Sequence, residues 1–426
     1  MKQHVDGIIR NIGQLVTLDG PPVPRCGPAM QALGIIEAGA VAMRGGRIID
    51  AGTEQDIVAA FGAPASEIFD AEGGVVLPGF VDPHTHVLFA GSRWREFELR
   101  CQGRSYQEIA AAGGGIRSSV RAFRAASDSE LKTQTRRRLD RMLALGTTTV
   151  EVKTGYGLDT EQELRALRLI DELDREHPVD LVPTFLGAHE FPDEYRDDRD
   201  GYVRLITDEM LPRVAAQTKA RFCDVFCEEG VFTAEQSRAI LQTARRLGLG
   251  LKLHADEFAP VGGSELAAEL GAISADHLLE ATEHGLMALR RGGVTAVLLP
   301  VTSLSLGKGR YAAARKMVQM DIPVALATDC NPGSSMTESM PLVMSMACLE
   351  LGLSPAEALT AATVNAAHAL GLAGDRGRVA PGLRADLQLL EAPSYVSLMY
   401  HLGASHVRRI FKNGRPVALE PVRGMK

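Results

Sequence analysis

The chain has 426 residues, of which 45% are hydrophobic and 23% charged, as in an ordinary globular protein with room for two or three domains. Its formal net charge of -7 excludes a basic field for nucleic acid or anionic lipid, and no run approaches the roughly 20 apolar residues of a membrane helix. Because no signal peptide is visible and the six cysteines are scattered, we expect a soluble cytoplasmic protein with reduced thiols.

Both ends of the chain have the pattern of β-hairpins. Gly45-Gly46 separates two strand-like runs near the N-terminus, and Asn413-Gly414 does the same near the C-terminus. Neither end has enough strands for a stable sheet by itself. We therefore expect the two ends to pair into one small composite β-sandwich domain. The expected parts are residues 1–73 and 371–426 for this domain and residues 74–370 for the inserted barrel.

The middle of the chain alternates strand-like runs with helical stretches. Thr160-Glu-Gln-Glu163 and Thr233-Ala-Glu-Gln236 have the capping-box pattern of helix starts, and Gly146 and Gly248 are placed as helix ends. Gly113-Gly-Gly115, in the first connection, is either a flexible stretch or a loop that closes over a ligand. The strand-like runs end at His86, Lys153, His189, Cys227, His254, His277, Leu299 and Asp329.

Eight such strand–helix units predict an α/β fold, a TIM-like (β/α)8 barrel. The rhythm alone also allows an open doubly wound sheet. That alternative fits less well, because no Gly-x-Gly-x-x-Gly fingerprint opens a helix after the first strand.

Polar groups that can bind a metal gather at the ends of these runs. Parallel barrel strands direct their C-terminal ends to one shared mouth, so residues far apart in the chain should converge there. His84 and His86, two positions apart on an extended strand, should point to the same face. Imidazoles with a carboxylate suit Zn²⁺ or Fe better than Mg²⁺ or Ca²⁺. The candidate metal ligands are His84, His86, His254 and Asp329.

At these residues the chain resembles the amidohydrolase superfamily over essentially its whole length. Leu77-Pro-Gly-Phe-Val-Asp-Pro-His-Thr-His86 is similar to the signature of its first strand, and the later histidines and Asp329 follow in its order. The fourth run, Phe222-Cys-Asp-Val-Phe-Cys227, ends without the lysine that binuclear members carbamylate. The resemblance therefore implies one metal ion, Zn²⁺ or Fe³⁺, per subunit.

Within that superfamily the chain resembles the imidazolonepropionase family. The resemblance implies metal-dependent hydrolysis of 4-imidazolone-5-propanoate to N-formimidoyl-L-glutamate in histidine degradation, with activated water attacking the ring carbonyl. The segments that carry it are His86-Val-Leu-Phe-Ala-Gly-Ser-Arg93, Ser105-Tyr-Gln-Glu-Ile-Ala-Ala-Ala-Gly-Gly-Gly-Ile116, Glu151-Val-Lys-Thr-Gly-Tyr-Gly157, Phe185-Leu-Gly-Ala-His189, His254-Ala-Asp-Glu257 and Thr328-Asp-Cys-Asn-Pro-Gly-Ser334.

Three residues are the candidates for proton transfer and charge stabilisation. Asp329 resembles the carboxylate that accepts a proton from the attacking water. Glu257 could accept or deliver that proton instead, or bind the ring nitrogens. His277 is expected beside the metal, where it could stabilise charge on the carbonyl oxygen or orient the hydroxide. The residues alone do not divide these roles.

A substrate with a propionate group needs a cation in its pocket. Arg93, in the first loop, can bind a carboxylate with two hydrogen bonds. The resemblance adds further candidate substrate contacts, which are Tyr156, His189, Asn331, Gly333 and Ser334.

Two other functions stay open at this point. Another mononuclear amidohydrolase, acting on a purine or a guanidine-like centre, would release ammonia. A catalytically silent scaffold would have lost metal positions, whereas all four candidate ligands are present here. The expected partner is a small molecule that carries a carboxylate, with no nucleic acid and no membrane, and exposed helices around a barrel are compatible with a homodimer.

Overall fold

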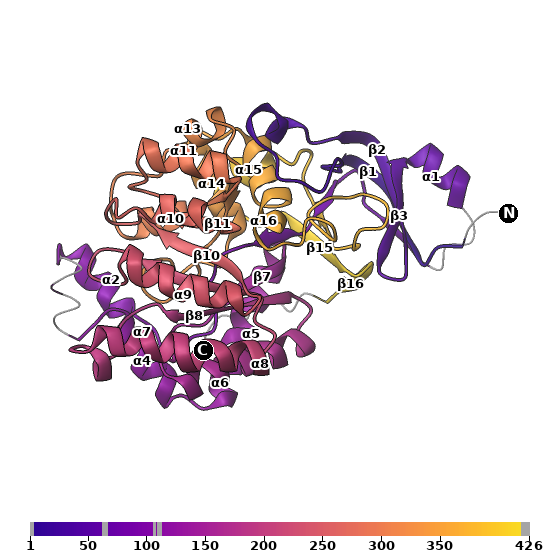
Figure 1. Ribbon diagram of the computed structural model, residues 1–426. Coiled ribbons are helices and arrows are strands. Elements are labelled where there is room, and N and C mark those ends of the chain that lie inside the picture. Colours follow the sequence, from indigo (N-terminus) through magenta and orange to yellow (C-terminus); the bar gives the residue numbers. More distant parts are fainter. Residues whose placement is uncertain (1–3, 62–66, 105–107, 109–112, 419–426) are drawn as a thin grey trace.

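The computed structural model describes residues 4–61, 67–104, 108 and 113–418, arranged around two sheets (Figure 1). Residues 105–107 and 109–112, which belong to one of the segments with family resemblance, lie outside the described residues. One sheet is built from both ends of the chain and the other from its middle.

The small sheet confirms that the two ends of the chain fold together. Its strand order is β16-β15-β14-β5-β1-β2-β3, with β4 paired to β1, so N-terminal and C-terminal strands share one hydrogen-bonded sheet. In Figure 1 the indigo strands of the N-terminus and the yellow strands of the C-terminus lie at the same end of the molecule. The strands are β1 (Gly7–Val16), β2 (Ile35–Arg44), β3 (Arg47–Thr53), β4 (Glu67–Asp70), β5 (Val75–Pro78), β14 (Leu387–Leu390), β15 (Val407–Lys412) and β16 (Arg415–Val417).

Both predicted hairpins are present in this sheet. Arg44 pairs with Arg47 across Gly45-Gly46, and Lys412 pairs with Arg415 across Asn413-Gly414. All four turn residues have positive φ, between 48° and 79°. This is the conformation of a two-residue type I′ turn, which glycine and asparagine adopt most easily.

The middle of the chain forms the predicted barrel of eight parallel strands. Neighbouring strands pair in chain order, and their side chains are buried almost throughout. The barrel closes between its first and last strands. There Thr85, in the segment after the first strand, forms a parallel bridge with Cys330, in the segment after the last strand. The strands are β6 (Phe80–Asp82), β7 (Thr147–Lys153), β8 (Asp180–Ala188), β9 (Phe222–Cys227), β10 (Gly250–Ala255), β11 (Ser274–His277), β12 (Thr295–Leu298) and β13 (Val324–Leu326).

Two strands end earlier than the sequence suggested. β6 ends at Asp82 because Pro83 has no backbone N–H to donate, so His84 and His86 lie in the segment after the strand rather than on it. β13 ends at Leu326, three residues before Asp329, whose φ of 52° lies outside the region of regular strands. Both polar segments therefore belong to the mouth of the barrel.

Helices connect the strands and cover the barrel. Gly146 and Gly248 follow α5 and α9 with φ of 98° and 86°, which confirms both as helix ends. The helices are α1 (Glu54–Phe61), α2 (Trp94–Cys101), α4 (Ile116–Ala125), α5 (Asp128–Ala144), α6 (Thr160–Glu176), α7 (Arg199–Leu205), α8 (Leu211–Gln217), α9 (Ala234–Arg246), α10 (Gly263–Glu269), α11 (Glu283–Gly292), α12 (Pro300–Ser305), α13 (Ala314–Gln319), α14 (Met340–Glu350), α15 (Pro355–Ala361), α16 (Val364–Ala369) and α17 (Ser397–Tyr400), with short η1 (Gly27–Gln31), η2 (Asp193–Tyr195) and η3 (Ile206–Met210).

One of the two predicted capping boxes is confirmed and the other is wrong. Thr233 and Gln236 exchange the two reciprocal hydrogen bonds of a capping box at the start of α9. At α6, however, Asp159 is the cap, and its side chain accepts from the N–H of Gln162. Glu163 is buried and binds the preceding loop instead, because its carboxylate accepts from backbone amides there.

A single residue, Gly79, separates β5 of the small sheet from β6 of the barrel. β5 pairs with β14 and β1 in the small sheet, and after Gly79 the chain enters β6 of the barrel. A Cβ at Gly79 would lie 2.3 Å from the side chain of Thr148, so the connection leaves no room for a side chain. The domain boundaries at residues 73 and 371 stay a prediction.

Two expectations from composition can be compared with the fold. All six cysteines are free thiols, and Cys223, Cys227 and Cys330 are buried. Within residues 4–61, 67–104, 108 and 113–418, no helix is long and apolar enough to span a bilayer.

Candidate active site

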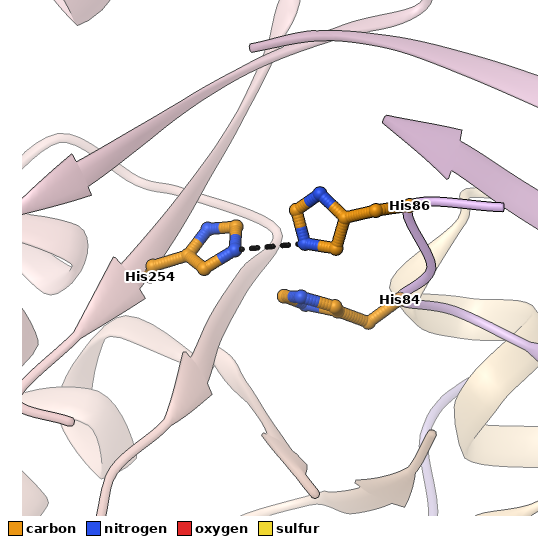
Figure 2. A group of neighbouring side chains, drawn as sticks. All are labelled: His84, His86 and His254. Carbon is orange, nitrogen blue, oxygen red and sulfur yellow. Dashed lines mark hydrogen bonds between the residues drawn. The ribbon is translucent and has the colours of Figure 1, made fainter. Parts of the chain in front are cut away.

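Three histidines from two segments converge at the mouth of the barrel. The N–H of Asp329 donates to the carbonyl of His84, and the N–H of His86 donates to the carbonyl of Cys330, both at 3.0 Å. These bonds hold the segment after β6 against the segment after β13. Figure 2 shows the rings of His84 and His86 pointing toward His254, which comes from β10.

The spacing of the donor atoms suits a single metal ion. Nε2 of His86 lies 3.4 Å from Nε2 of His254, and Oδ1 of Asp329 lies 3.5 Å from Nε2 of His84 and 3.6 Å from Nε2 of His86. Two ligands bound at 2.0–2.1 Å to one tetrahedral zinc lie about 3.4 Å apart. The donor atoms of His84, His86 and His254 all lie within 4.8 Å of one another, and Asp329 lies beside two of them.

Hydrogen bonding leads to the same conclusion. Nε2 of His84 is buried and has no hydrogen-bond partner among the described residues. Nε2 of His86 and Nε2 of His254 form a long hydrogen bond of 3.4 Å, drawn in Figure 2, in which one ring donates and the other accepts. A cation between the rings would instead be bound by the lone pair of each Nε2.

Carboxylates lie behind the rings of two predicted ligands. Asp276 lies 2.6 Å from Nδ1 of His84, and Asp224 lies 3.1 Å from Nδ1 of His254. Asp276 accepts the Nδ1 proton of His84, so that ring presents the lone pair of Nε2 to the site. Burial lowers the pKa of His84 well below its usual value, with a further contribution from Lys153 and the neighbouring histidines. His84 is therefore neutral, as a metal ligand must be.

Asp329 is held at the centre of the site by its neighbours. Its Oδ2 accepts a hydrogen bond of 2.7 Å from the hydroxyl of Thr302, which leaves Oδ1 directed at the histidines. Burial raises the pKa of Asp329 to about 6. Aspartate tolerates the left-handed backbone found here better than most residues do.

Glu257 and His277 lie close to each other, and both line the cavity. Oε2 of Glu257 is 3.7 Å from Nε2 of His277. Burial raises the pKa of Glu257 to about 8, Lys308 opposes that rise, and the charges of Asp329 and Glu228 add to it. Glu257 is therefore mostly protonated at neutral pH, whereas Asp329 is mostly ionised.

Glu228 holds the loop that carries Glu257. Its carboxylate accepts from the backbone N–H groups of Glu257, Phe258 and Ala259 at 2.9–3.1 Å. Three bonds to successive amides fix this loop at the end of β10.

Arg93 lies on the wall formed by the first loop. Its Nη2 forms an ion pair of 2.7 Å with Glu96, whose carboxylate also accepts from the N–H of Gly115 at 3.3 Å. The guanidinium packs against Gly333, where an added Cβ would lie 2.1 Å from Nη1. A side chain at position 333 would therefore have to move the guanidinium of Arg93.

Tyr156 and His189 line the cavity next to the predicted metal ligands. Nδ1 of His189 donates to the carbonyl of Gly155 at 3.0 Å, so its Nε2 is a hydrogen-bond acceptor. Burial and the nearby His254 lower the pKa of His189 to about 3, which keeps the ring neutral. Its ring stacks on that of His86 with centroids 4.9 Å apart.

Asn331, Gly333 and Ser334 form a tight loop after Asp329. Oδ1 of Asn331 accepts from the N–H groups of Gly333 and Ser334 at 2.8 Å, and its Nδ2 donates to the carbonyl of Asp329 at 2.7 Å. These groups bind one another in the unliganded chain. Direct contacts from them to a substrate stay a prediction.

One cavity collects nearly all of the predicted site residues. His84 is completely buried beneath it. The cavity is lined by His86, Arg93, Ile116, Tyr156, His189, Phe226, His254, Glu257, Phe258, His277, Leu306, Asp329, Asn331, Gly333 and Ser334.

The sequence analysis missed the charged side chains beneath the histidines. They sit at alternate positions of otherwise apolar strands, as in Glu151-Val-Lys153 and Lys252-Leu-His254. Alternate positions share one face of a strand, so these charges point inward, where burying them requires partners. That signal could have identified them. The residues are Glu151, Lys153, Asp224, Lys252 and Asp276.

Comparisons with known proteins agree on the family and the fold of the chain. The model of the amidohydrolase family matches residues 75–417. An imidazolonepropionase of Geobacillus kaustophilus is 49% identical over 412 residues, which cover 96% of this chain and 97% of the relative. One of Solibacter usitatus is 50% identical and covers 97% of this chain and 98% of its own. The solved guanine deaminase of E. coli has the same fold, with a TM-score of 0.75 at 17% identity over 97% of this chain and 99% of that chain.

Proposed function

The chain belongs to the amidohydrolase family and, within it, to the imidazolonepropionases, and from this premise we propose how its residues open the ring of 4-imidazolone-5-propanoate. The observation that carries the proposal is the cavity itself. It is lined by His86, His254 and Asp329, which are proposed metal ligands, and by Arg93, which is proposed to bind the carboxylate.

The donor set fits one metal ion, for which we propose Zn²⁺ or Fe³⁺. His84, His86, His254 and Asp329 would hold it, because the donor atoms of the three histidines lie within 4.8 Å of one another and Oδ1 of Asp329 lies 3.5 Å and 3.6 Å from two of them. When bound, such an ion lowers the pKa of a coordinated water and polarises a carbonyl oxygen.

Two carboxyl groups with separated pKa values divide the proton transfers. Asp329, with a pKa of about 6, is the acceptor for the proton of the water that adds to the ring carbonyl. Glu257, with a pKa of about 8, is the donor that protonates the ring nitrogen as the C–N bond breaks. When the surroundings of two carboxyl groups give them different pKa values, the group with the lower pKa can act as the base and the group with the higher pKa as the acid.

The remaining wall residues bind and orient the substrate. Arg93 is proposed to bind the propionate, supported by its ion pair to Glu96, which fixes the guanidinium at the cavity. His189 and Tyr156 are proposed to contact the ring, since both line the cavity beside His86. His277 is proposed to orient the attacking water or donate to the carbonyl oxygen, and its short distance to Glu257 supports that place.

The test compares substrates and two variants. Metal-loaded protein should consume freshly made 4-imidazolone-5-propanoate, followed by loss of the ring absorbance, without releasing ammonia. Asp329→Ala should abolish turnover, whereas Arg93→Ala should mainly raise KM. Protein that leaves this compound untouched but deaminates a purine, or variants with equal and mild effects, would contradict the assignment.

We also propose that the chain acts as a cytoplasmic homodimer. Large apolar side chains on its surface, with Tyr400 85%, Leu349 64% and Leu402 57% exposed, support a face that a second copy covers. Sedimentation equilibrium should give twice the chain mass of 45.7 kDa. A mass that stays at one chain up to high concentration would contradict the dimer.

A further inference from the structure

Four apolar side chains line the cavity beside its polar groups, and the reaction proposed above assigns no role to them. Three of them come from a loop or a helix end and are partly exposed, with Phe258 41% exposed. Phe226 differs, because it lies within β9 and is only 7% exposed. Among the described residues that line the cavity, it is the one buried apolar side chain on a barrel strand. The four residues are Ile116, Phe226, Phe258 and Leu306.

The register of the barrel sheet places Phe226 directly beside a predicted metal ligand. Phe226 is the register partner of His254 on the neighbouring parallel strand β10. Register partners on neighbouring strands point to the same face of a sheet. The ring centroids of Phe226 and His254 lie 5.5 Å apart. His189, which follows β8 on the other side of β9, has its ring centroid 6.2 Å from that of Phe226. The phenyl ring therefore lies between two histidines of the site.

The order of the strands places Phe226 across the barrel mouth from Arg93. Arg93 follows β6, the first strand, and its guanidinium packs against Gly333, which follows β13, the last strand. These two strands adjoin where the barrel closes. β9 lies four strands from β13 in either direction around the barrel, which is the facing side of a closed sheet of eight strands. A molecule held by Arg93 therefore extends across the mouth toward Phe226.

Two anchors set the direction of the substrate ring between these sides. The proposed placement has the propionate at Arg93 and the ring carbonyl at the metal ligands. The propionate is carried on C5 of the ring and the carbonyl carbon is C4, so the opposite edge of the ring consists of C2 and N3. That edge points away from Arg93. Glu257, the proposed proton donor to the ring nitrogen, follows β10, the neighbour of β9, and so lies on the same side as Phe226.

We propose that Phe226 is a specificity-determining residue, whose phenyl ring packs against the C2 edge of the substrate ring and leaves no space for a substituent on C2. This inference rests on the proposed placement of the substrate by Arg93 and the metal ligands. A strand residue suits this task, because β8 and β10 pair with β9 on both sides and hold its backbone in place. The wall is also apolar, so a polar group on C2 would lose water there without gaining a hydrogen bond from the phenyl ring.

The experiment compares 4-imidazolone-5-propanoate with its derivative that carries a methyl group on C2, both freshly made and followed by loss of the ring absorbance. Metal-loaded wild type should have a kcat/KM at least about 10-fold lower for the derivative, since one carbon too many at a fitted apolar wall costs about 10- to 200-fold. Phe226→Ala opens space for the methyl group, so the ratio of the two kcat/KM values should fall by about tenfold or more. Any intrinsic difference in reactivity between the two compounds is the same for every variant and cancels when the ratios are compared.

Phe61→Ala is the matched control. Phe61 is also 7% exposed, and it packs in an apolar cluster of the small sheet, with Val5, Ile8 and Ile57, rather than at the barrel mouth. The same substitution there removes an equally buried phenyl ring, and the ratio of the two kcat/KM values should stay that of wild type. An equal ratio in wild type and Phe226→Ala, or the same change of ratio in both variants, would overturn the proposal.

A smaller change keeps the test decisive if the alanine variant does not fold. Phe226→Leu keeps an apolar side chain but removes the flat ring, so the ratio should shift in the same direction as expected for alanine. A ratio that stays at the wild-type value in this variant would overturn the proposal.

The substrate placement and the role of Phe226 fail in different ways. An unchanged KM for 4-imidazolone-5-propanoate in Arg93→Ala would contradict the placement itself. A raised KM in Arg93→Ala, beside equal ratios in wild type and Phe226→Ala, would contradict only the role of Phe226.

Discussion

The guanidinium of Arg93 occupies the space that a side chain at position 333 would need at the cavity wall. Arg93 belongs to the first loop of the barrel and Gly333 to the last, so the barrel closure brings them together. The need for a cation beside the propionate made Arg93 a candidate substrate contact, and the family resemblance added Gly333. The structure adds the reason for the glycine, because a Cβ at this position would lie 2.1 Å from Nη1 of Arg93.

Gly333→Ala should therefore displace Arg93 and weaken substrate binding. We expect KM to rise about 10- to 100-fold with little change in kcat, since a charge-assisted hydrogen bond to a carboxylate contributes roughly 1.5–3 kcal/mol. Steady-state kinetics with 4-imidazolone-5-propanoate provide the measurement. The control is Gly374→Ala, because a Cβ there has no atom within 4 Å. An unchanged KM in Gly333→Ala would show that Arg93 does not bind the propionate.

The raised pKa of Glu257 predicts an alkaline limit to the reaction. A donor with a pKa of about 8 is protonated below that pH and loses its proton above it, so kcat/KM should fall as the pH rises through about 8. Lys308 opposes the effect of burial by favouring the ionised carboxylate. Lys308→Met should therefore shift the alkaline limb to higher pH, and Glu257→Gln should remove it. A limb that stays in place in both variants would assign it to another group.

Single residues also show which contacts the sequence does not predict. The convergence of His84, His86, His254 and Asp329 could be predicted because strand ends of a barrel share one mouth, and their role as metal ligands stays a prediction. The contact between His84 and Asp276 joins residues 192 positions apart, and no spacing rule relates them. It depends on the register of strands across the barrel, which a periodic pattern does not specify.

At the scale of elements, local sequence patterns predicted every barrel strand. They did not predict the hydrogen-bond partner of every polar side chain. Thr160 and Glu163 match a capping box by spacing, yet Asp159 takes the cap because its short side chain reaches the N–H of Gln162. Glu163 is then available for the loop before α6. It accepts from the N–H groups of Gly157 and Leu158 at 2.9 Å.

Glu163→Gln should loosen the loop that carries Tyr156. The variant leaves buried amides with poorer acceptors, so the free energy of unfolding should fall by about 1–3 kcal/mol and KM should rise. Thr233→Ala removes an ordinary helix cap at α9, and it should cost about 1 kcal/mol without any effect on KM. Denaturant unfolding and kinetics on both variants separate the two. Equal KM values would show that the loop does not depend on Glu163.

At the scale of the whole molecule, the two ends of the chain form one core beside the barrel. Phe411 of β15 is completely buried, and its ring packs edge-on against Phe69 of β4 with centroids 5.0 Å apart. Hairpin signals at both ends predicted that they meet. Those signals did not predict the pairing of β5 with β14, because the sequence pattern placed Val75–Pro78 at the start of the barrel.

Phe411→Ala should destabilise the protein although it lies far from the catalytic residues in the chain. Emptying a buried aromatic site costs about 3–5 kcal/mol. Ile68→Ala, at a side chain 58% exposed on the same sheet, should change the free energy of unfolding by no more than about 0.5 kcal/mol. Denaturant unfolding of both variants provides the measurement. Equal, small effects would mean that the small sheet adds little to the stability of the chain.

The most direct test of the whole account is a metal titration of the depleted enzyme. Chelator-treated protein should be inactive on 4-imidazolone-5-propanoate, and activity should return linearly until one equivalent of Zn²⁺ or Fe³⁺ has been added, with no ammonia released. His254→Asn should bind the metal more weakly in the same titration. Full activity after complete metal removal, or a requirement for two equivalents, would contradict a hydrolase built on one metal ion held by His84, His86, His254 and Asp329.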